Sequence, residues 1–166
     1  MAKRLATVAA VAAIVATSAM VVSGPASAAP SAGPVRVPLA GVFRLCDHSA
    51  KTYVPTVGNA QGVASVSTAG NTVIAQVTFG YAPPNTHYTV RLIQTPLPST
   101  RDCGPGVAGV AVGALDTDQL GNGQTTVQDT RRAGATGAWV FIDRAAEFSQ
   151  IPAEHYTSDF IAPLGG

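Results

Sequence analysis

The stretch Thr72–Phe79, with the sequence TVIAQVTF, decides the fold class of this chain. Its odd-numbered positions from Val73 to Phe79 are all apolar, and the even-numbered ones are polar apart from Ile74. Apolar residues at every second position match the side-chain period of a β-strand. The stretch is therefore predicted to be a strand with one face in a core.

A second stretch, Thr86–Gln94, has the sequence THYTVRLIQ and repeats this alternation. The period places Tyr88, Val90 and Leu92 toward the core and His87 toward solvent. The six residues between the two stretches include two adjacent prolines, so they continue neither strand.

Other short stretches rich in apolar and β-branched residues lie between turn signals of Gly, Asn and Pro. They are residues 41–46, 63–68, 109–115, 124–129, 138–143 and 156–161. No segment keeps a helical period for three turns, and 144–150 is long enough for one turn only. With no helices to cross over between parallel strands, the sequence predicts an all-β antiparallel two-sheet sandwich with immunoglobulin-like or Greek-key connections.

Residues 1–28 have the three parts of a cleavable secretory signal peptide. Lys3 and Arg4 supply the basic start, residues 5–22 are almost wholly apolar, and small residues lead up to Ala28. We expect cleavage between residues 28 and 29 and export to the extracellular space or cell envelope. A retained anchor helix is the alternative, because the apolar run approaches the length that crosses a bilayer.

The exported part begins with residues 29–38, in which three prolines among Ala, Ser and Gly predict a flexible lead-in. Residues 39–166 suit one β-sandwich domain. Without residues 1–28, the chain has eight Lys and Arg residues and nine Asp and Glu residues. This near-neutral balance gives no support for binding nucleic acid or an anionic membrane, and we expect no stable membrane insertion after signal removal.

Cys46 and Cys103 are the only cysteines, and both lie in the exported part. In an oxidising compartment they are expected to form one disulfide. Closing a loop of this length stabilises a fold by about 4 kcal/mol in the chain-entropy treatment. Cys46-Asp47-His48 is the alternative, a zinc-ligand cluster, but it lacks paired Cys-x-x-Cys spacing and would lose its thiolates to the disulfide. We expect no metal and no cofactor.

The segment Asp116–Gly123, DTDQLGNG, resembles the start of a calcium loop because oxygen-bearing side chains alternate with spacers. Leu120 stands where the third oxygen ligand belongs, and no acidic residue closes the loop. A hairpin turn, whose Asp and Asn side chains bond their own backbone, explains the same residues.

Residues 95–106, TPLPSTRDCGPG, form the most distinctive loop, named here loop 95–106. Proline stiffening and a covalent bond at Cys103 would hold it in one shape, which lowers the entropy cost of binding a partner. A crossover rigidified for stability alone is the other interpretation. The candidate partner-binding residues are Pro96, Leu97, Pro98, Ser99, Thr100 and Arg101.

A hydrolase would need a nucleophile, a base and an orienting group, and His48 or His155 is the candidate base. No Gly-x-Ser-x-Gly motif accompanies them. Trp139 and Phe141 alternate with Val140 and Ile142, so one pair is expected to point into the core. The aromatic pair would form a ligand-binding platform if it were exposed, but burial suits large aromatic side chains better.

The strand at 88–90, the cysteine loop, and Thr117–Gly123 leading into Thr125-Thr126-Val127 resemble small secreted immunoglobulin-like domains of actinobacteria, including enediyne-binding apoproteins. That resemblance covers about residues 62–142 and implies a fold rather than a function. We expect a non-enzymatic secreted protein with a binding or structural role, toward an extracellular or envelope protein or a small ligand. The alternatives are an inhibitor or effector acting through loop 95–106, and a hydrolase.

Overall fold

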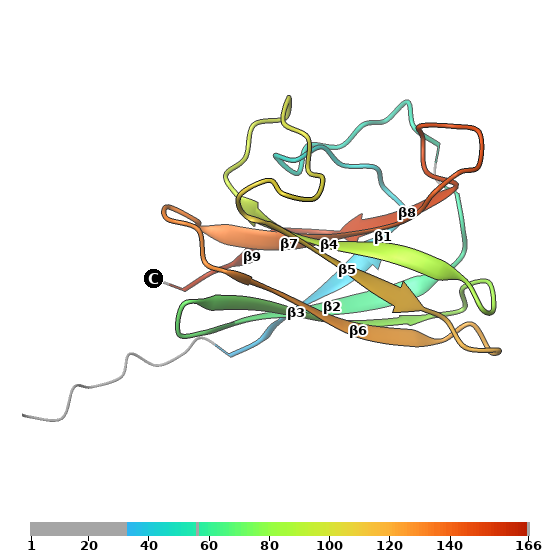
Figure 1. Ribbon diagram of the computed structural model, residues 1–166, viewed down its shortest axis with the longest axis horizontal. Coiled ribbons are helices and arrows are strands. Elements are labelled where there is room, and N and C mark those ends of the chain that lie inside the picture. The colour runs from blue at the N-terminus through green and yellow to red at the C-terminus, as the bar shows by residue number, and fades with distance from the viewer. Residues whose placement is uncertain (1–32, 56, 166) are drawn as a thin grey trace, which may run out of the picture.

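The computed structural model describes residues 33–55 and 57–165, so the predicted signal peptide and residues 29–32 lie outside the described part. Within that part the chain forms nine strands and no helix (Figure 1). This confirms the all-β antiparallel prediction. The strands are β1 (Val35–Ala40), β2 (Gln61–Ala69), β3 (Thr72–Gly80), β4 (His87–Thr95), β5 (Val110–Asp116), β6 (Gly123–Thr130), β7 (Gly137–Arg144), β8 (Glu154–Ser158) and β9 (Ala162–Pro163).

The strands make one hydrogen-bonded path in the order β5-β4-β7-β8-β1-β2-β3-β6, with β9 paired to β7. The end strands β5 and β6 lie against each other, since a Cβ on Gly113 would meet Val127 at 2.7 Å. The sheet is therefore nearly closed. The predicted division into two separate sheets is not confirmed, because β1 pairs with β2 along Val35–Leu39 and with β8 at Leu39 and Ala40.

The two stretches that suggested the fold are strands β3 and β4. The inward residues of β3, from Val73 to Phe79, are at most 2 % exposed, and Tyr88, Val90 and Leu92 of β4 are fully buried. Phe79 packs edge-on against the rings of Tyr88 and Tyr156 in the main core. The face assignment from the period of two is thus confirmed.

Several predicted elements and boundaries differ from the structure. Residues 41–46 form no strand but a turn region with a single bridge between Arg44 and Ala50. The strand lies earlier, at Val35–Ala40, so part of the predicted lead-in belongs to the sheet. Pro38 is tolerated because it is in register with β2 alone, and β1 has strand partners on both sides only at Leu39.

At the C-terminal end, Arg144 is the last residue of β7, and residues 145–150 contain bends rather than the predicted helical turn. Strand β8 ends at Ser158, and the chain bends before β9 instead of continuing to Ile161.

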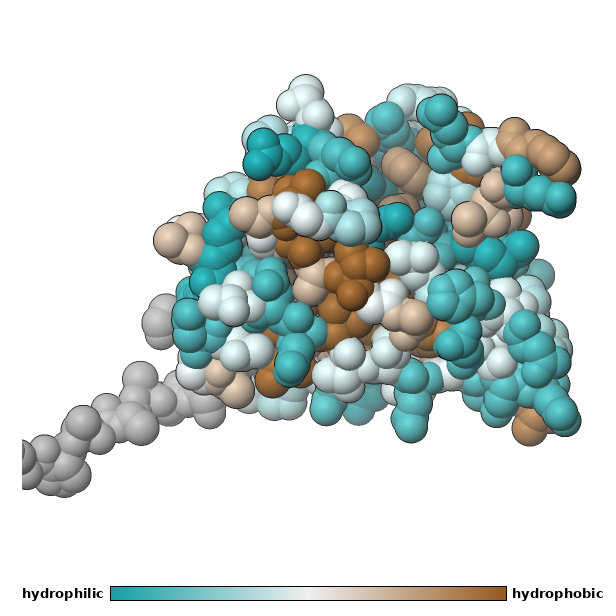
Figure 2. Space-filling view, viewed as in Figure 1, coloured by the Kyte–Doolittle hydropathy of each residue, from teal (hydrophilic) through white to brown (hydrophobic). Residues whose placement is uncertain are grey.

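On the side seen in Figure 2, apolar side chains reach the surface over β5, whose Val112 is 40 % exposed. No helix of the described residues is long and apolar enough to cross a membrane.

Candidate functional site: the loop-covered face of β4, β7 and β8

Three long connections lie on one side of the molecule, above β7, β4 and β8 (Figure 1). They are residues 41–55 and 57–60, loop 95–106 with the residues up to β5, and residues 145–153. The sheet face beneath them points away from the main core. We call this region the loop-covered face.

Strand β7 is buried on both sides. Its even-numbered residues from Ala138 to Ile142 enter the main core, whereas Trp139 and Phe141 enter a second, smaller core under the loops. Neither pair is an exposed platform, so the sequence alternatives for these residues are resolved in favour of burial on both faces. A strand that is apolar at consecutive positions is typical of this situation. The second core consists of Cys46, Ile93, Leu97, Val110, Trp139 and Phe141.

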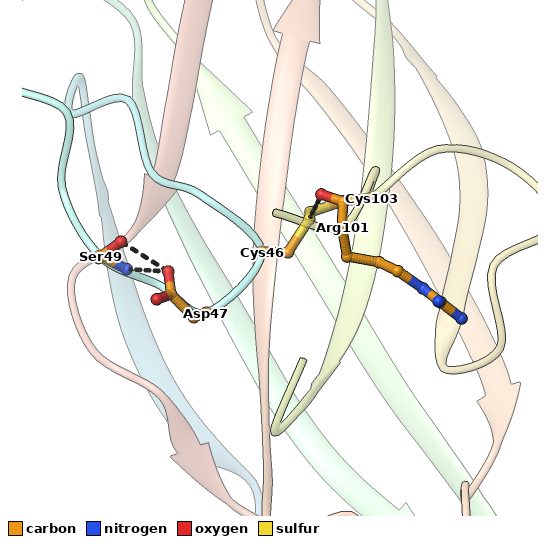
Figure 3. The surroundings of a disulfide bond; sticks show 5 residues. All are labelled: Cys46, Asp47, Ser49, Arg101 and Cys103. Atoms are coloured by element: carbon orange, nitrogen blue, oxygen red, sulfur yellow. Dashed lines mark hydrogen bonds between the residues drawn. A yellow bond between two sulfur atoms is a disulfide. The ribbon is translucent and has the colours of Figure 1, made fainter. Parts of the chain in front are cut away.

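The predicted disulfide is present between Cys46 and Cys103, whose Cα atoms are 5.7 Å apart. It joins the first two loops above the second core (Figure 3). The Arg101 carbonyl oxygen lies 2.7 Å from Cys46 Sγ. This is a close contact rather than a hydrogen bond, since a disulfide sulfur carries no proton. Asp47 accepts hydrogen bonds from the backbone and side chain of Ser49, which close the turn beside the disulfide.

The six candidate residues of loop 95–106 do not all face the same way. Leu97 is buried in the second core and cannot contact a partner directly. Pro96, Pro98, Ser99, Thr100 and Arg101 are exposed. The Arg101 side chain points away from the disulfide and makes no hydrogen bond or ion pair in the described part of the chain (Figure 3).

A cavity of about 300 Å³ opens between the three loops. Its lining includes Phe43, Phe141 and the disulfide, together with Arg91 and Asp143, which form an ion pair of 2.8 Å. The Arg91 guanidinium also lies 5.1 Å from the centre of the Phe141 ring, a cation–π arrangement. Burial raises the pKa of Asp143, and the Arg91 charge partly offsets that effect.

His155 is fully buried next to this cavity. It faces Asp143 across the β7–β8 pair, and Phe43 packs edge-on against its ring at 5.3 Å. Neither ring nitrogen has a hydrogen-bond partner among the described residues. Burial lowers its pKa, and the Asp143 carboxylate partly counteracts this, so the imidazole is neutral at pH 7.

His48 packs edge-on against the Trp139 ring and its Nε2 donates a hydrogen bond of 2.8 Å to the Ser158 carbonyl oxygen. Burial lowers its pKa as well. Neither His48 nor His155, the two histidines of the hydrolase hypothesis, makes a hydrogen bond to a hydroxyl group in the described part of the chain.

In the candidate calcium loop, the Asp118 side chain forms hydrogen bonds within its own turn. The Asp118 carboxylate accepts hydrogen bonds from the backbone N–H groups of Leu120 and Asn122, as the hairpin-turn interpretation predicts. No group of three or more metal-ligating side chains occurs in residues 33–55 and 57–165.

Sequence reasoning missed a buried polar cluster on the other side of β8. The Glu154 carboxylate, 4 % exposed, accepts a hydrogen bond from Tyr88 at 2.7 Å and pairs with Arg144 at 2.8 Å. Burial and this carboxylate raise the pKa of Tyr88. The three residues come from different strands, so no local pattern could have shown the cluster.

No family model, curated protein or solved structure matches this chain. The fold itself defines the class of this protein, an antiparallel all-β protein in which a disulfide joins two loops over one sheet face.

We expect stability to fall as the pH drops below about 6.5, the usual pKa of histidine. His48 and His155 have lowered pKa values when folded, so the unfolded chain binds protons first and acid favours unfolding. The pKa of Asp143 is raised in the folded protein, so protonation of this residue at lower pH favours the folded state. Urea unfolding at pH 7.5 and 5.5 measures the effect. His155→Gln should reduce the difference more than the exposed control His87→Gln; an equal reduction by both variants would contradict the assignment.

Proposed function

We propose that this chain is an exported, non-enzymatic binding protein that recognises a protein partner outside the cell or in the cell envelope. Export rests on the signal-peptide features of residues 1–28. Recognition is assigned to the exposed part of loop 95–106. One observation carries this proposal: the loop is fixed near both ends, yet it presents Pro98, Ser99, Thr100 and Arg101 to solvent.

Several contacts fix the loop. Leu97 is buried in the second core, and Cys103 is bonded to Cys46. The Pro96 carbonyl oxygen accepts a hydrogen bond of 2.6 Å from Arg132, and the Arg101 backbone N–H donates to the Pro98 carbonyl oxygen at 3.0 Å. A segment held in this way loses little conformational entropy on binding, which favours affinity.

The same loop supports a second candidate function, inhibition of an extracellular protease that cleaves after basic residues. Arg101 is exposed and its side chain is unengaged, while its carbonyl group lies against the disulfide. An inhibitor needs such a segment, rigid and with one side chain free to enter a specificity pocket.

Capture of partners by the protein purified from culture medium tests both candidates. Replacing Thr100 and Arg101 by Ala should weaken capture at least tenfold, since the anchors stay intact and only exposed groups are removed. Under the second candidate the same variant also loses inhibition of a protease panel. Leu120→Ala, at a residue 79 % exposed outside the loop, is the matched control. If the double variant captures the same proteins as wild type, loop 95–106 is not the recognition surface.

We further propose that the nearly closed sheet acts as an immunoglobulin-like two-layer sandwich, with β1-β2-β3-β6 as one layer and β5-β4-β7-β8 as the other. Support comes from the short β1–β8 junction, which has only Leu39 and Ala40 of β1 in register with β8. A likeness to secreted actinobacterial domains belongs to the same proposal and rests on the sequence of residues 62–142.

A further inference from the structure

The outward face of β2, β3 and β6 carries no charged side chain. Hydroxyl and amide groups predominate, and the three strands contain one charged residue, Asp129, whose carboxylate accepts a hydrogen bond of 2.8 Å from Gln94. Exposed sheet faces usually carry Lys and other charges, which discourage association of edges and faces. The outward positions with polar side chains are Gln61, Ser65, Ser67, Thr72, Gln76, Thr78, Gln124, Thr126, Gln128 and Thr130. We call this surface the amide–hydroxyl face.

The amide and hydroxyl groups form pairs across β3 and β6. Gln76 is in register with Thr126, and Thr78 with Gln124, which brings each pair of side chains to about 5 Å at Cβ. None of these four side chains makes a hydrogen bond within the described residues. Each group both donates and accepts hydrogen bonds. These four side chains are therefore available to form hydrogen bonds with a ligand that also both donates and accepts them.

A groove of about 730 Å³ lies at one end of this face. Thr78 and Gln124 line it. Gly80, which has no side chain, leaves the backbone exposed at the last outward position of β3. Tyr81, 78 % exposed, stands at the groove directly after β3. An exposed tyrosine offers an apolar ring face and a polar hydroxyl group, a combination that suits an amphipathic ligand.

The lining excludes several kinds of partner. The groove has two charged residues, Arg36 and Asp118, which are of opposite sign, so nothing favours a polyanion such as nucleic acid. The Asp118 carboxylate is already occupied by backbone N–H groups of its turn. A protein interface would need buried aromatic, Met or Arg anchors at its centre, and the centre of the amide–hydroxyl face has none.

We propose that the amide–hydroxyl face binds a neutral polysaccharide. The hydroxyl groups of such a chain donate and accept hydrogen bonds as the Gln and Thr rows do, and the C–H face of one sugar ring packs on Tyr81. A polymer can follow the paired Gln and Thr side chains along β3 and β6 and enter the groove at their end. This site lies on the side of the molecule away from loop 95–106 (Figure 1), so it is independent of recognition through that loop.

Affinity electrophoresis of the protein from culture medium, in gels containing soluble neutral glucan, mannan or galactan, tests the proposal. Binding to cellulose is measured by sedimentation. We expect retardation or co-sedimentation with at least one neutral polymer and none with polygalacturonate. Gln76→Glu combined with Gln124→Glu keeps the side-chain size but adds like charges to both strands, and should weaken binding at least tenfold. Tyr81→Asn, chosen because Asn tolerates the φ of 58° at this position, should weaken it similarly.

The Thr100→Ala, Arg101→Ala variant is the matched control and should bind polysaccharide as wild type does. Loss of partner capture with retained polysaccharide binding would separate the two sites. The proposal is overturned if no neutral polymer is bound, or if the Gln76, Gln124 and Tyr81 variants bind as tightly as wild type. Concentration-dependent dimerisation abolished by the glutamate variant would also overturn it, and would assign the face to a second copy of the chain.

Discussion

Replacing Trp139 by Ala is expected to lower the free energy of unfolding by about 3–5 kcal/mol. The indole is fully buried and lies between β7 and the loops, in contact with the rings of His48 and Phe141. Its removal leaves a cavity beneath the two disulfide-joined loops, which supply Cys46 and Leu97 to the same core. Because whole domains are stable by about 5–15 kcal/mol, the loss is a large fraction of the total. Urea unfolding followed by circular dichroism measures it.

Two matched variants separate packing from other effects of the Trp139 substitution. Trp139→Phe keeps a ring in place, and because the indole Nε1 has no partner among the described residues, it removes no hydrogen bond. Its cost should be clearly smaller. Val112→Ala, at a residue 40 % exposed on β5, should change stability by less than about 0.5 kcal/mol. A loss below 1 kcal/mol for Trp139→Ala would show that the second core contributes little.

Removing the disulfide is the change with the second largest expected effect. Cys46→Ala combined with Cys103→Ala should lower the free energy of unfolding by about 4 kcal/mol, the chain-entropy value for a closed loop of this length. The cross-link spans 57 positions and restricts the unfolded chain more than the folded one. Loop 95–106 also loses one of its anchors, so partner capture should weaken as well.

The control for the disulfide is the wild-type protein unfolded with and without reductant. Reduced wild type and the double alanine variant should unfold at similar urea concentrations, both below the oxidised protein. Equal midpoints for oxidised and reduced protein would refute the stabilising role. Retained partner capture by the double variant would show that Leu97 and Arg132 alone hold loop 95–106 in its binding shape.

The local alternation of apolar and polar residues was sufficient to predict most of the strands. The period of two placed Val73, Val77 and Tyr88 on buried faces without reference to any other segment, because backbone pleating alone alternates the side chains. It did not find β1, where prolines suggested a lead-in. Whether Pro38 interrupts a strand depends on which strands pair with β1 at that residue: β2 does, whereas the register with β8 begins only at Leu39.

The candidate sites divide in the same way. The disulfide was predicted from the cysteine number and the expected export, and the Asp118 turn from local side-chain chemistry. By contrast, the burial of Leu97 in a loop predicted to be exposed depends on a second core under that loop. The Glu154 cluster and the Arg91–Asp143 pair each join residues from separate strands, so they exist only after the strands are ordered.

By itself, then, the sequence determined that this protein is all-β, antiparallel and cross-linked at Cys46 and Cys103, because strand period and cysteine chemistry act over short or single-residue patterns. Only the tertiary structure decided that the sheet nearly closes, that β7 is buried on both faces, and that polar rows on β3 and β6 stand side by side. Those features depend on strand order and on which loops fold back over the sheet. Both are set by contacts between residues far apart in the chain.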